Sequence, residues 1–179
     1  MTAETTLYGL VAEFDSPEAL LAAARDAYRA GYRRMDGYSP FPVEGLPEAI
    51  GFRHTWVPLI VLIGGIAGGV GGFFMQWYAS VISYPINVGG RPLNSWPAFI
   101  PITFELTVLL AAFAAVIGML VLNGLPRPYH PVFNAPHFEL ASVNRFFLCI
   151  EAADPQFDRI GTWQFLESLR PDNVAEVAP

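Results

Sequence analysis

The residue best placed to do chemistry is Glu105, a carboxylate within an otherwise apolar stretch from about Ala98 to Leu122. An ionisable side chain is costly inside a bilayer, where it often marks a proton path or a contact with a partner. Gln76 lies near the matching end of an earlier apolar stretch. Glu105 can therefore belong to a proton path or bind a partner. Alternatively, it has only a packing role, as a carboxylate that is hydrogen-bonded in a protein interface or hydrated at the membrane edge. We expect the packing role, with Glu105 in the first two turns of its helix and Gln76 as its donor.

Other reactive side chains do not form a recognisable site. His54, His130 and His137 flank the apolar stretches, but they lack the convergent spacing that a metal site needs. Cys149 is the only cysteine, so an intrachain disulfide and an all-Cys iron–sulfur site are excluded. Its position within a strand-like apolar run indicates an inert core thiol. We expect no catalytic, metal-binding or cofactor-binding residue in this chain.

Two stretches, 56–78 and 98–122, are long and apolar enough to cross a membrane as helices. The first contains no charged residue, and the second contains only Glu105. They are separated by a loop at 79–97 and predict a transmembrane hairpin. The net charge of −6 argues against nucleic acid and against an anionic lipid surface as the main partner.

The first stretch carries a stripe of glycines spaced four residues apart. Small residues let helix backbones approach closely in a membrane, where lipid supplies no hydrophobic drive between helices. The second stretch offers alanines at similar spacing. The residues expected to pack the helices are Gly64, Gly65, Gly68, Gly69, Gly72, Ala111 and Ala115.

The segment before the hairpin predicts a strand, a helix and a strand. Residues 7–14 are rich in strand formers, and Asp15 with Pro17 marks the start of a helix that Gly31 ends. Residues 33–38 read as a second, shorter strand. Asp15 is therefore interpreted as a helix cap rather than as a catalytic acid.

The segment after the hairpin repeats this order. Residues 145–152 predict a strand, and Asp154 with Pro155 predicts the start of an amphipathic helix that carries Phe157 and Ile160 on its apolar face. A weaker strand follows at 173–177. Two such units make the βαββαβ order of a ferredoxin-like sandwich, here with the hairpin inserted between its halves. Two flanks lying separately on partner subunits are the alternative.

The fold class expected is therefore a membrane α+β protein, with a two-helix hairpin between two βαβ halves. Proline-rich segments join the parts, and such segments tend to lie across other protein rather than pack on themselves. The expected division is a first βαβ half at 1–40, a linker at 41–55, the first span at 56–78, an external loop at 79–97, the second span at 98–122, a proline-rich linker at 123–144 and a second βαβ half at 145–179.

Arginine distribution predicts the orientation of the hairpin. Five arginines precede the first span, one lies between the spans and four follow the second. Because cytoplasmic flanks carry the excess of basic residues, both termini are expected in the cytoplasm. Arg53 and Arg127 would then lie inside the cell and Arg91 outside.

Four segments together resemble one family. They are YGLVAEFDSPEAL, YRRMDGYSPFPVEGL, IGGIAGGVGGFFMQWY and YPINVGGRPLNSWPAFIPITFEL. From about Leu7 to Leu169, the chain resembles the D subunit of bacterial alternative complex III, the quinol-oxidising assembly that replaces the cytochrome bc1 complex. The resemblance implies a place in the inner membrane beside multi-span subunits, with haem and iron–sulfur groups held by partner subunits and none here.

The function expected is that of a non-catalytic structural subunit that anchors itself to larger membrane subunits. Two alternatives stay open. One is direct participation in proton transfer through Glu105, and the other is a free-standing two-helix membrane sensor whose ferredoxin-like domain binds a ligand.

Overall fold

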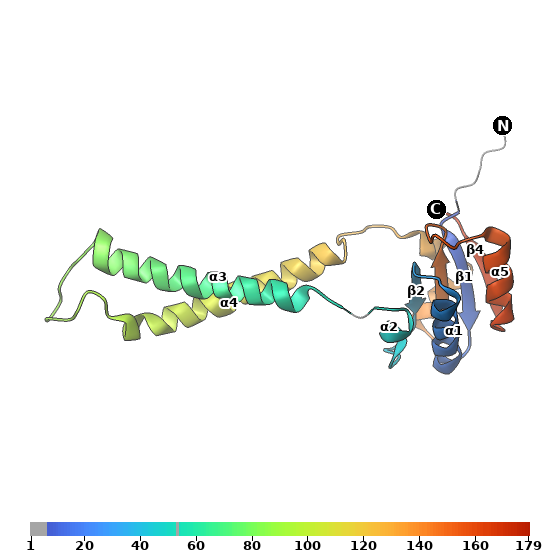
Figure 1. The fold of residues 1–179 in the computed structure, drawn as a ribbon, viewed down its shortest axis with the longest axis horizontal. Helices are drawn as coiled ribbons and strands as arrows, with labels where there is room; N and C mark the ends of the chain where they lie inside the picture. Colours follow the sequence, from blue (N-terminus) through green and yellow to red (C-terminus); the bar gives the residue numbers. More distant parts are fainter. Residues whose placement is uncertain (1–6, 53) are drawn as a thin grey trace, which may run out of the picture. The chain divides into compact units, whose positions relative to one another are not determined.

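The computed structural model describes residues 7–52 and 54–179, and the chain divides into two compact units. One unit combines the flanks Met1–Arg53 and Pro128–Pro179, and the other is His54–Arg127. Arg53, which the orientation argument counts, lies outside the described residues. The elements in chain order are β1 Gly9–Phe14, α1 Pro17–Ala30, β2 Met35–Tyr38, α2 Leu46–Ala49, α3 Val57–Trp77, the π-helical turn η1 Tyr78–Ser83, α4 Trp96–Leu122, the 3₁₀ turns η2 Pro131–Asn134 and η3 Phe138–Ser142, β3 Phe146–Glu151, α5 Arg159–Ser168 and β4 Asn173–Val177 (Figure 1).

The first unit contains a four-stranded antiparallel sheet in the order β2-β3-β1-β4. The central strands β1 and β3 come from opposite sides of the hairpin and pair with Val11 opposite Cys149. All six residues of β1 are buried, because the strand has neighbours on both edges and both faces of the sheet are covered. The expected pairing of the two flanks, with the first and third strands in the centre, is confirmed.

One face of the sheet packs against α1 and α5. Alternate residues of the central strands, including Leu10 and Leu148, point to this face and are fully buried with Leu20 of α1 and Leu166 of α5. Strand side chains alternate between faces, so this arrangement uses half of each central strand.

The opposite face is covered by η2 and η3, which belong to the proline-rich segment after the hairpin. Val132 of η2 and Phe138 of η3 are buried together with Val11, Phe147 and Cys149 of the sheet. This part of the proline-rich segment therefore packs on the chain's own sheet.

The first helix begins and ends where local signals place it. Ser16 Oγ accepts a hydrogen bond from the backbone N–H of Ala19, and Pro17 occupies the first helical position. Gly31 adopts φ +107°, a left-handed conformation that ends the helix and that side chains with a Cβ avoid. The cap is therefore Ser16, and the interpretation of Asp15 as the cap was wrong.

The start of α5 differs from the prediction. The helix begins at Arg159, where Asp158 Oδ2 accepts a hydrogen bond from Gly161 N–H at 2.7 Å. Asp154 does not cap it, because its carboxylate is bonded elsewhere. Ile160 is 70% exposed, so its assignment to the apolar face was also wrong.

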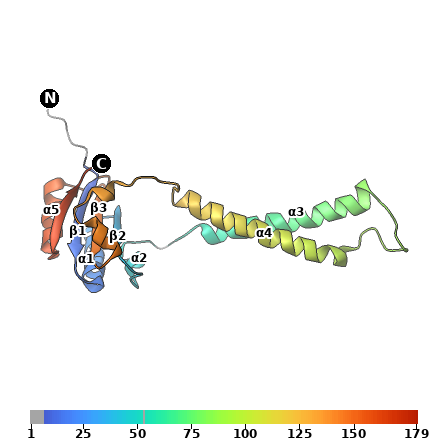
Figure 2. The ribbon, with the colours of Figure 1, turned by 180° about the vertical axis from the view of Figure 1, so that it is seen from behind.

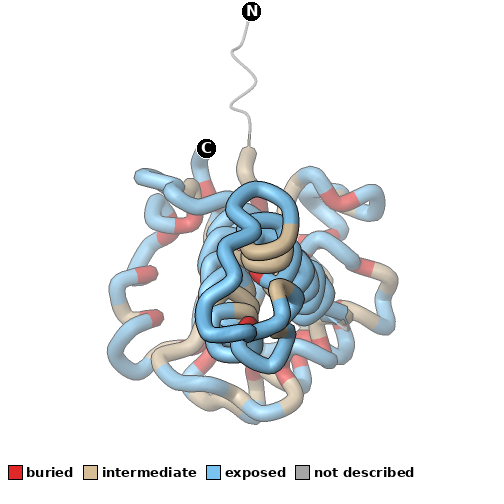
Figure 3. The backbone as a smooth tube through the Cα atoms, turned by 90° about the vertical axis from the view of Figure 1, so that its left-hand side faces the viewer, coloured by how far each residue is buried: buried red, intermediate tan, exposed pale blue. Residues whose placement is uncertain are grey.

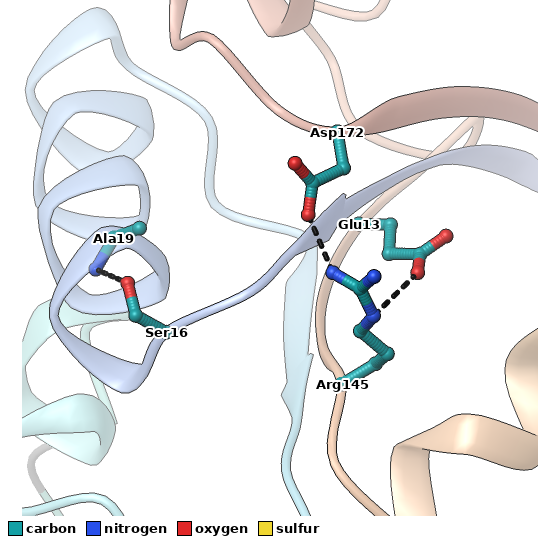
Figure 4. Close-up of polar contacts among 5 residues, drawn as sticks. All are labelled: Glu13, Ser16, Ala19, Arg145 and Asp172. Carbon is teal, nitrogen blue, oxygen red and sulfur yellow. Dashed lines mark hydrogen bonds and ion pairs between the residues drawn. The ribbon is translucent and has the colours of Figure 1, made fainter.

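An arginine joins three strands of the sheet unit at one end. Arg145, just before β3, places Nε 3.3 Å from Oε1 of Glu13 on β1 and a terminal nitrogen 2.6 Å from Oδ2 of Asp172, just before β4 (Figure 4). Glu13 is buried, so the guanidinium supplies the opposite charge that its carboxylate needs there. The Ser16 cap contact with Ala19 is drawn in the same view.

The second unit is an antiparallel hairpin of α3 and α4, which lie side by side in both views (Figure 1 and Figure 2). Helical structure covers Val57–Ser83 and Trp96–Leu122, so the loop between them is 84–95 rather than the expected 79–97. Both helices are long and apolar enough to cross a membrane, with mean hydropathy 2.1 and 2.4. Only 11% and 6% of their apolar windows are buried, and most of the hairpin is pale blue in Figure 3. These are not the buried core helices of a soluble domain.

Candidate functional site

Glycines of α3 form the seam between the hairpin helices. A Cβ added at Gly68 would strike the carbonyl oxygen of Leu106, and one added at Gly64 would come within 2.5 Å of the Ala114 methyl. Gly65, Gly68 and Gly72 are buried although most of the helix is exposed. Because these glycines lack side chains, the backbone of α3 can lie directly against α4.

The alanines of α4 take part unequally in this seam. The Ala111 methyl lies 3.7 Å from the position of a Cβ at Gly65, as the sequence led us to expect. Beside Gly64 the nearest methyl belongs to Ala114, whereas Ala115 is half-buried next to it. Gly69 faces the Thr107 hydroxyl, a neighbour that the search for small residues missed because threonine is not small.

Gln76 adds a polar contact at the far end of the seam. Its side-chain amide donates to the carbonyl of Phe99 at 3.0 Å and reaches the hydroxyl of Thr103 at 3.3 Å, both on α4. It also lies 3.1 Å from the carbonyl of Gly72 within its own helix. Gln76 is therefore an interhelical donor, as expected. The prediction that Glu105 accepts its hydrogen bond was wrong.

Glu105 is exposed and does not lie in the seam. The residues of α4 that meet the glycines of α3 include Thr103, Leu106 and Thr107. A residue two positions before Thr107 leaves the helix roughly 160° away from it, because successive residues turn by about 100°. The carboxylate therefore faces away from α3.

A second polar cluster lies on the sheet unit, where the segment after the hairpin reaches the sheet. Tyr8 O–H donates to Glu151 Oε1 at 3.2 Å, and the Tyr8 oxygen lies 3.3 Å from His130 Nε2. The backbone N–H of Val132 donates to His130 Nδ1 at 3.3 Å. The ring proton must then be on Nε2, which completes a chain from Val132 through His130 and Tyr8 to Glu151.

The electrostatics of this cluster favour its neutral forms. Burial, followed by the Glu151 carboxylate, raises the pKa of the Tyr8 hydroxyl above its usual range. Burial, followed by Asp36 and Glu151, raises the pKa of Cys149 to about 12. A thiol with such a pKa is a poor nucleophile at neutral pH, which agrees with the expected inert role of Cys149.

The remaining histidines do not join the cluster. His54 is exposed, and His137 adopts φ +60° where η3 begins. Within residues 7–52 and 54–179, no group of three or more His, Cys, Asp or Glu side chains is arranged to hold a metal ion.

Comparison with known proteins identifies the family. A family model described as "Alternative complex III, ActD subunit" matches residues 8–176, which is nearly the whole chain. No curated protein matches the sequence. The match spans both flanks of the sheet unit as well as the hairpin, so it concerns the complete two-unit architecture. The chain belongs to the ActD family, the members of which are subunits of alternative complex III.

Proposed function

We propose that this protein is a non-catalytic structural subunit that holds a ferredoxin-like domain at the bacterial inner membrane through a two-helix anchor. The observation that carries the proposal is the hairpin itself. Its inner faces are closed by glycines, whereas its outer faces expose large apolar side chains such as Ile66, Val70 and Phe104. Such faces are stable only against lipid or other membrane helices.

Strand order and helix placement support the ferredoxin-like assignment. The sheet order read in reverse is β4-β1-β3-β2, and the two helices of the βαβ halves pack on the same face. The departure from a simple sandwich is the second face, which η2 and η3 cover. A covered face is less available to a ligand, which argues against the sensor alternative. Membership of a family of complex subunits also argues against it.

Orientation follows from two independent features. Because β1 and β3 pair, the flanks of the hairpin lie on the same side of any membrane that the two helices cross. The arginine excess on the flanks favours the cytoplasm as that side, with the loop at 84–95 outside.

Cysteine labelling tests this orientation in the full chain after Cys149→Ser. A cysteine at Asn87 should react with a membrane-impermeant maleimide added outside intact spheroplasts, and one at Arg127 should react only after lysis. The reverse pattern would contradict the proposed orientation.

The multi-span subunits of the complex are the proposed partners, and its haem and iron–sulfur groups are assigned to partner subunits. Purification in mild detergent tests this assignment. The chain should co-purify with quinol-oxidising activity in stoichiometric amounts, and a chain that runs alone would support a sensor.

Exchange of Glu105 for Gln tests the structural role against proton transfer. The amide that replaces the carboxylate could still form a hydrogen bond but could not release a proton. Assembly and quinol turnover should both stay near the wild-type level, and a large loss of turnover in a fully assembled complex would instead support the proton path.

A further inference from the structure

Glu105 lies deep enough in α4 to fall within the hydrocarbon core of a membrane that the helix crosses. The helix begins at Trp96, two residues earlier than the sequence indicated, so Glu105 is two and a half turns inside it. At 1.5 Å per residue it lies about 14 Å along a helix of about 40 Å. A hydrocarbon core of about 30 Å centred on α4 would therefore include Glu105, and the glutamate side chain is too short to reach the headgroups easily.

No donor in the described part of the chain satisfies this carboxylate. The amide of Gln76 is engaged on the opposite side of α4, and the Thr107 hydroxyl donates to the carbonyl of Thr103 at 2.7 Å. Burying a carboxyl group without a hydrogen-bond partner is unfavourable whichever protonation state it adopts. A hydrogen-bond partner for Glu105 would therefore have to lie outside the described residues.

A proline interrupts the backbone hydrogen-bond ladder of α4 one turn before Glu105. Pro101 sits inside α4, one turn before Glu105, and has no N–H to donate to the carbonyl of Pro97. Residues four apart share a helix face, so Pro101 lies on the same side of α4 as Glu105. One i to i−4 backbone hydrogen bond is therefore missing from the turn that precedes the carboxylate.

The side chains around Glu105 leave room for a close neighbour. Ala98 and Ala112 lie seven residues before and after it, and all three are exposed. Larger exposed side chains, Ile102 and Leu109, lie along one side of the track that these residues form. Small residues at a spacing of seven are typical of membrane helices that cross at an angle of about 20°. The carboxylate of Glu105 lies midway between two such residues.

We propose that the face of α4 marked by Ala98, Glu105 and Ala112 binds a transmembrane helix of another subunit, which presents a hydrogen-bond donor to Glu105. Lipid tails contain no donor, so they cannot replace this helix. This inference rests on the proposed function as an anchoring subunit and adds the face, the residue and the chemistry of the contact.

Photo-crosslinking in native membranes tests the interface. Benzoylphenylalanine at Leu109 lies on the proposed face, and at Ile66 it lies on the outer side of α3 with similar exposure and serves as a control for reactivity. The probe at Leu109 should yield a covalent adduct with a membrane segment of another subunit that carries a donor side chain. Lipid adducts alone at Leu109, in a complex that still co-purifies, would overturn the inference.

Two variants of Glu105 test the hydrogen bond separately. With the probe at Leu109, Glu105→Gln should keep the adduct yield, because an amide still accepts. Glu105→Leu should lower it about fivefold, the size expected for one interhelical hydrogen bond. Equal yields for Glu105→Leu and wild type would overturn the donor contact. Failure of the proposed function looks different, since wild-type chain would then not co-purify with any membrane subunit.

Discussion

Asp154 and Arg33, 121 residues apart in the chain, are joined by a 2.6 Å hydrogen bond from the backbone N–H of Arg33 to Oδ2 of Asp154. The N–H of Arg34 donates to the same oxygen at 2.7 Å, and that of Gln156 donates to Oδ1 at 2.8 Å. Asp154 is buried, so its carboxylate ties the entrance of β2 to the loop that follows β3.

Asp154→Asn should destabilise the sheet unit, because an amide cannot accept all three N–H groups. Leaving a buried N–H unpaired costs about 1–3 kcal/mol. Hydrogen exchange of the Arg33 and Arg34 amides in the detergent-solubilised chain measures the loss. Asp15→Asn, at an exposed carboxylate, is the matched control and should leave this exchange unchanged.

The same carboxylate predicts a pH dependence. Burial alone would raise the pKa of Asp154, but the N–H donors of Arg34, Arg33 and Gln156 outweigh it and hold the pKa below the ordinary value of 3.8. A lowered pKa in the folded state means that the stabilisation is complete above the ordinary pKa and is lost as pH falls through the folded value. The stability difference between wild type and Asp154→Asn should therefore shrink in acid. A difference that stays constant down to the acid transition would contradict this assignment.

Gly68→Leu should separate the hairpin helices, since any side chain there meets the backbone of α4 at Leu106. Overpacking of this kind costs about 1–3 kcal/mol. Gly71→Leu is a close control, because a Cβ at Gly71 has nothing within 4 Å. The thermal stability of the solubilised chain should fall for the first variant and not for the second. Equal losses would mean that the close approach of Gly68 to Leu106 does not decide the outcome.

Gln76 and Thr103 should show energetic coupling. A double-mutant cycle with Gln76→Leu and Thr103→Val, followed by reversible unfolding in mixed detergent and SDS micelles, should give about 0.6 kcal/mol, the average for such bonds in membranes. The cycle of Gln76→Leu with Glu105→Leu should give a value near zero, because Gln76 is bonded to Phe99 and Thr103 instead. Strong coupling in the second cycle would restore Glu105 as its partner.

Tyr8→Phe should loosen the start of η2 while keeping the aromatic contact with His130. It removes the O–H that links His130 to Glu151, and a typical net hydrogen bond of about 1 kcal/mol corresponds to roughly fivefold faster opening. Hydrogen exchange of the Val132 amide measures this change. Tyr129→Phe removes a hydroxyl from an exposed neighbour and should leave the exchange rate unaltered.

Sequence patterns within one segment predicted the bounds of some helices and strands to the residue. They failed where residues distant in the sequence determine the structure. The helix at 17–30 has Pro17 at its first position and is flanked directly by Ser16 and Gly31, so its bounds were predicted correctly although its cap was not. Asp154 beside Pro155 resembles another helix start, but two of the three N–H groups that use its carboxylate, those of Arg33 and Arg34, lie at the other end of the sequence. No local pattern could reveal them.

The hairpin shows the same division. Glycine spacing predicted which face of α3 would pack, because that face is a property of one helix. The partner of Gln76 was mistaken because matching depth in the membrane says nothing of rotation about the axis. Thr103 and Glu105 lie at nearly the same depth, but only Thr103 faces α3.

Pairing of β1 with β3 across the hairpin has a consequence for biosynthesis. The ribosome synthesises both spans before residues 146–151, so β1 remains unpaired with β3 until then. When the first span has crossed, the sheet can close only if the second span crosses as well, because the second crossing returns the chain to the side of β1. Formation of the sheet thus checks the insertion, and a chain with one failed crossing keeps an open strand edge that proteases and chaperones can recognise.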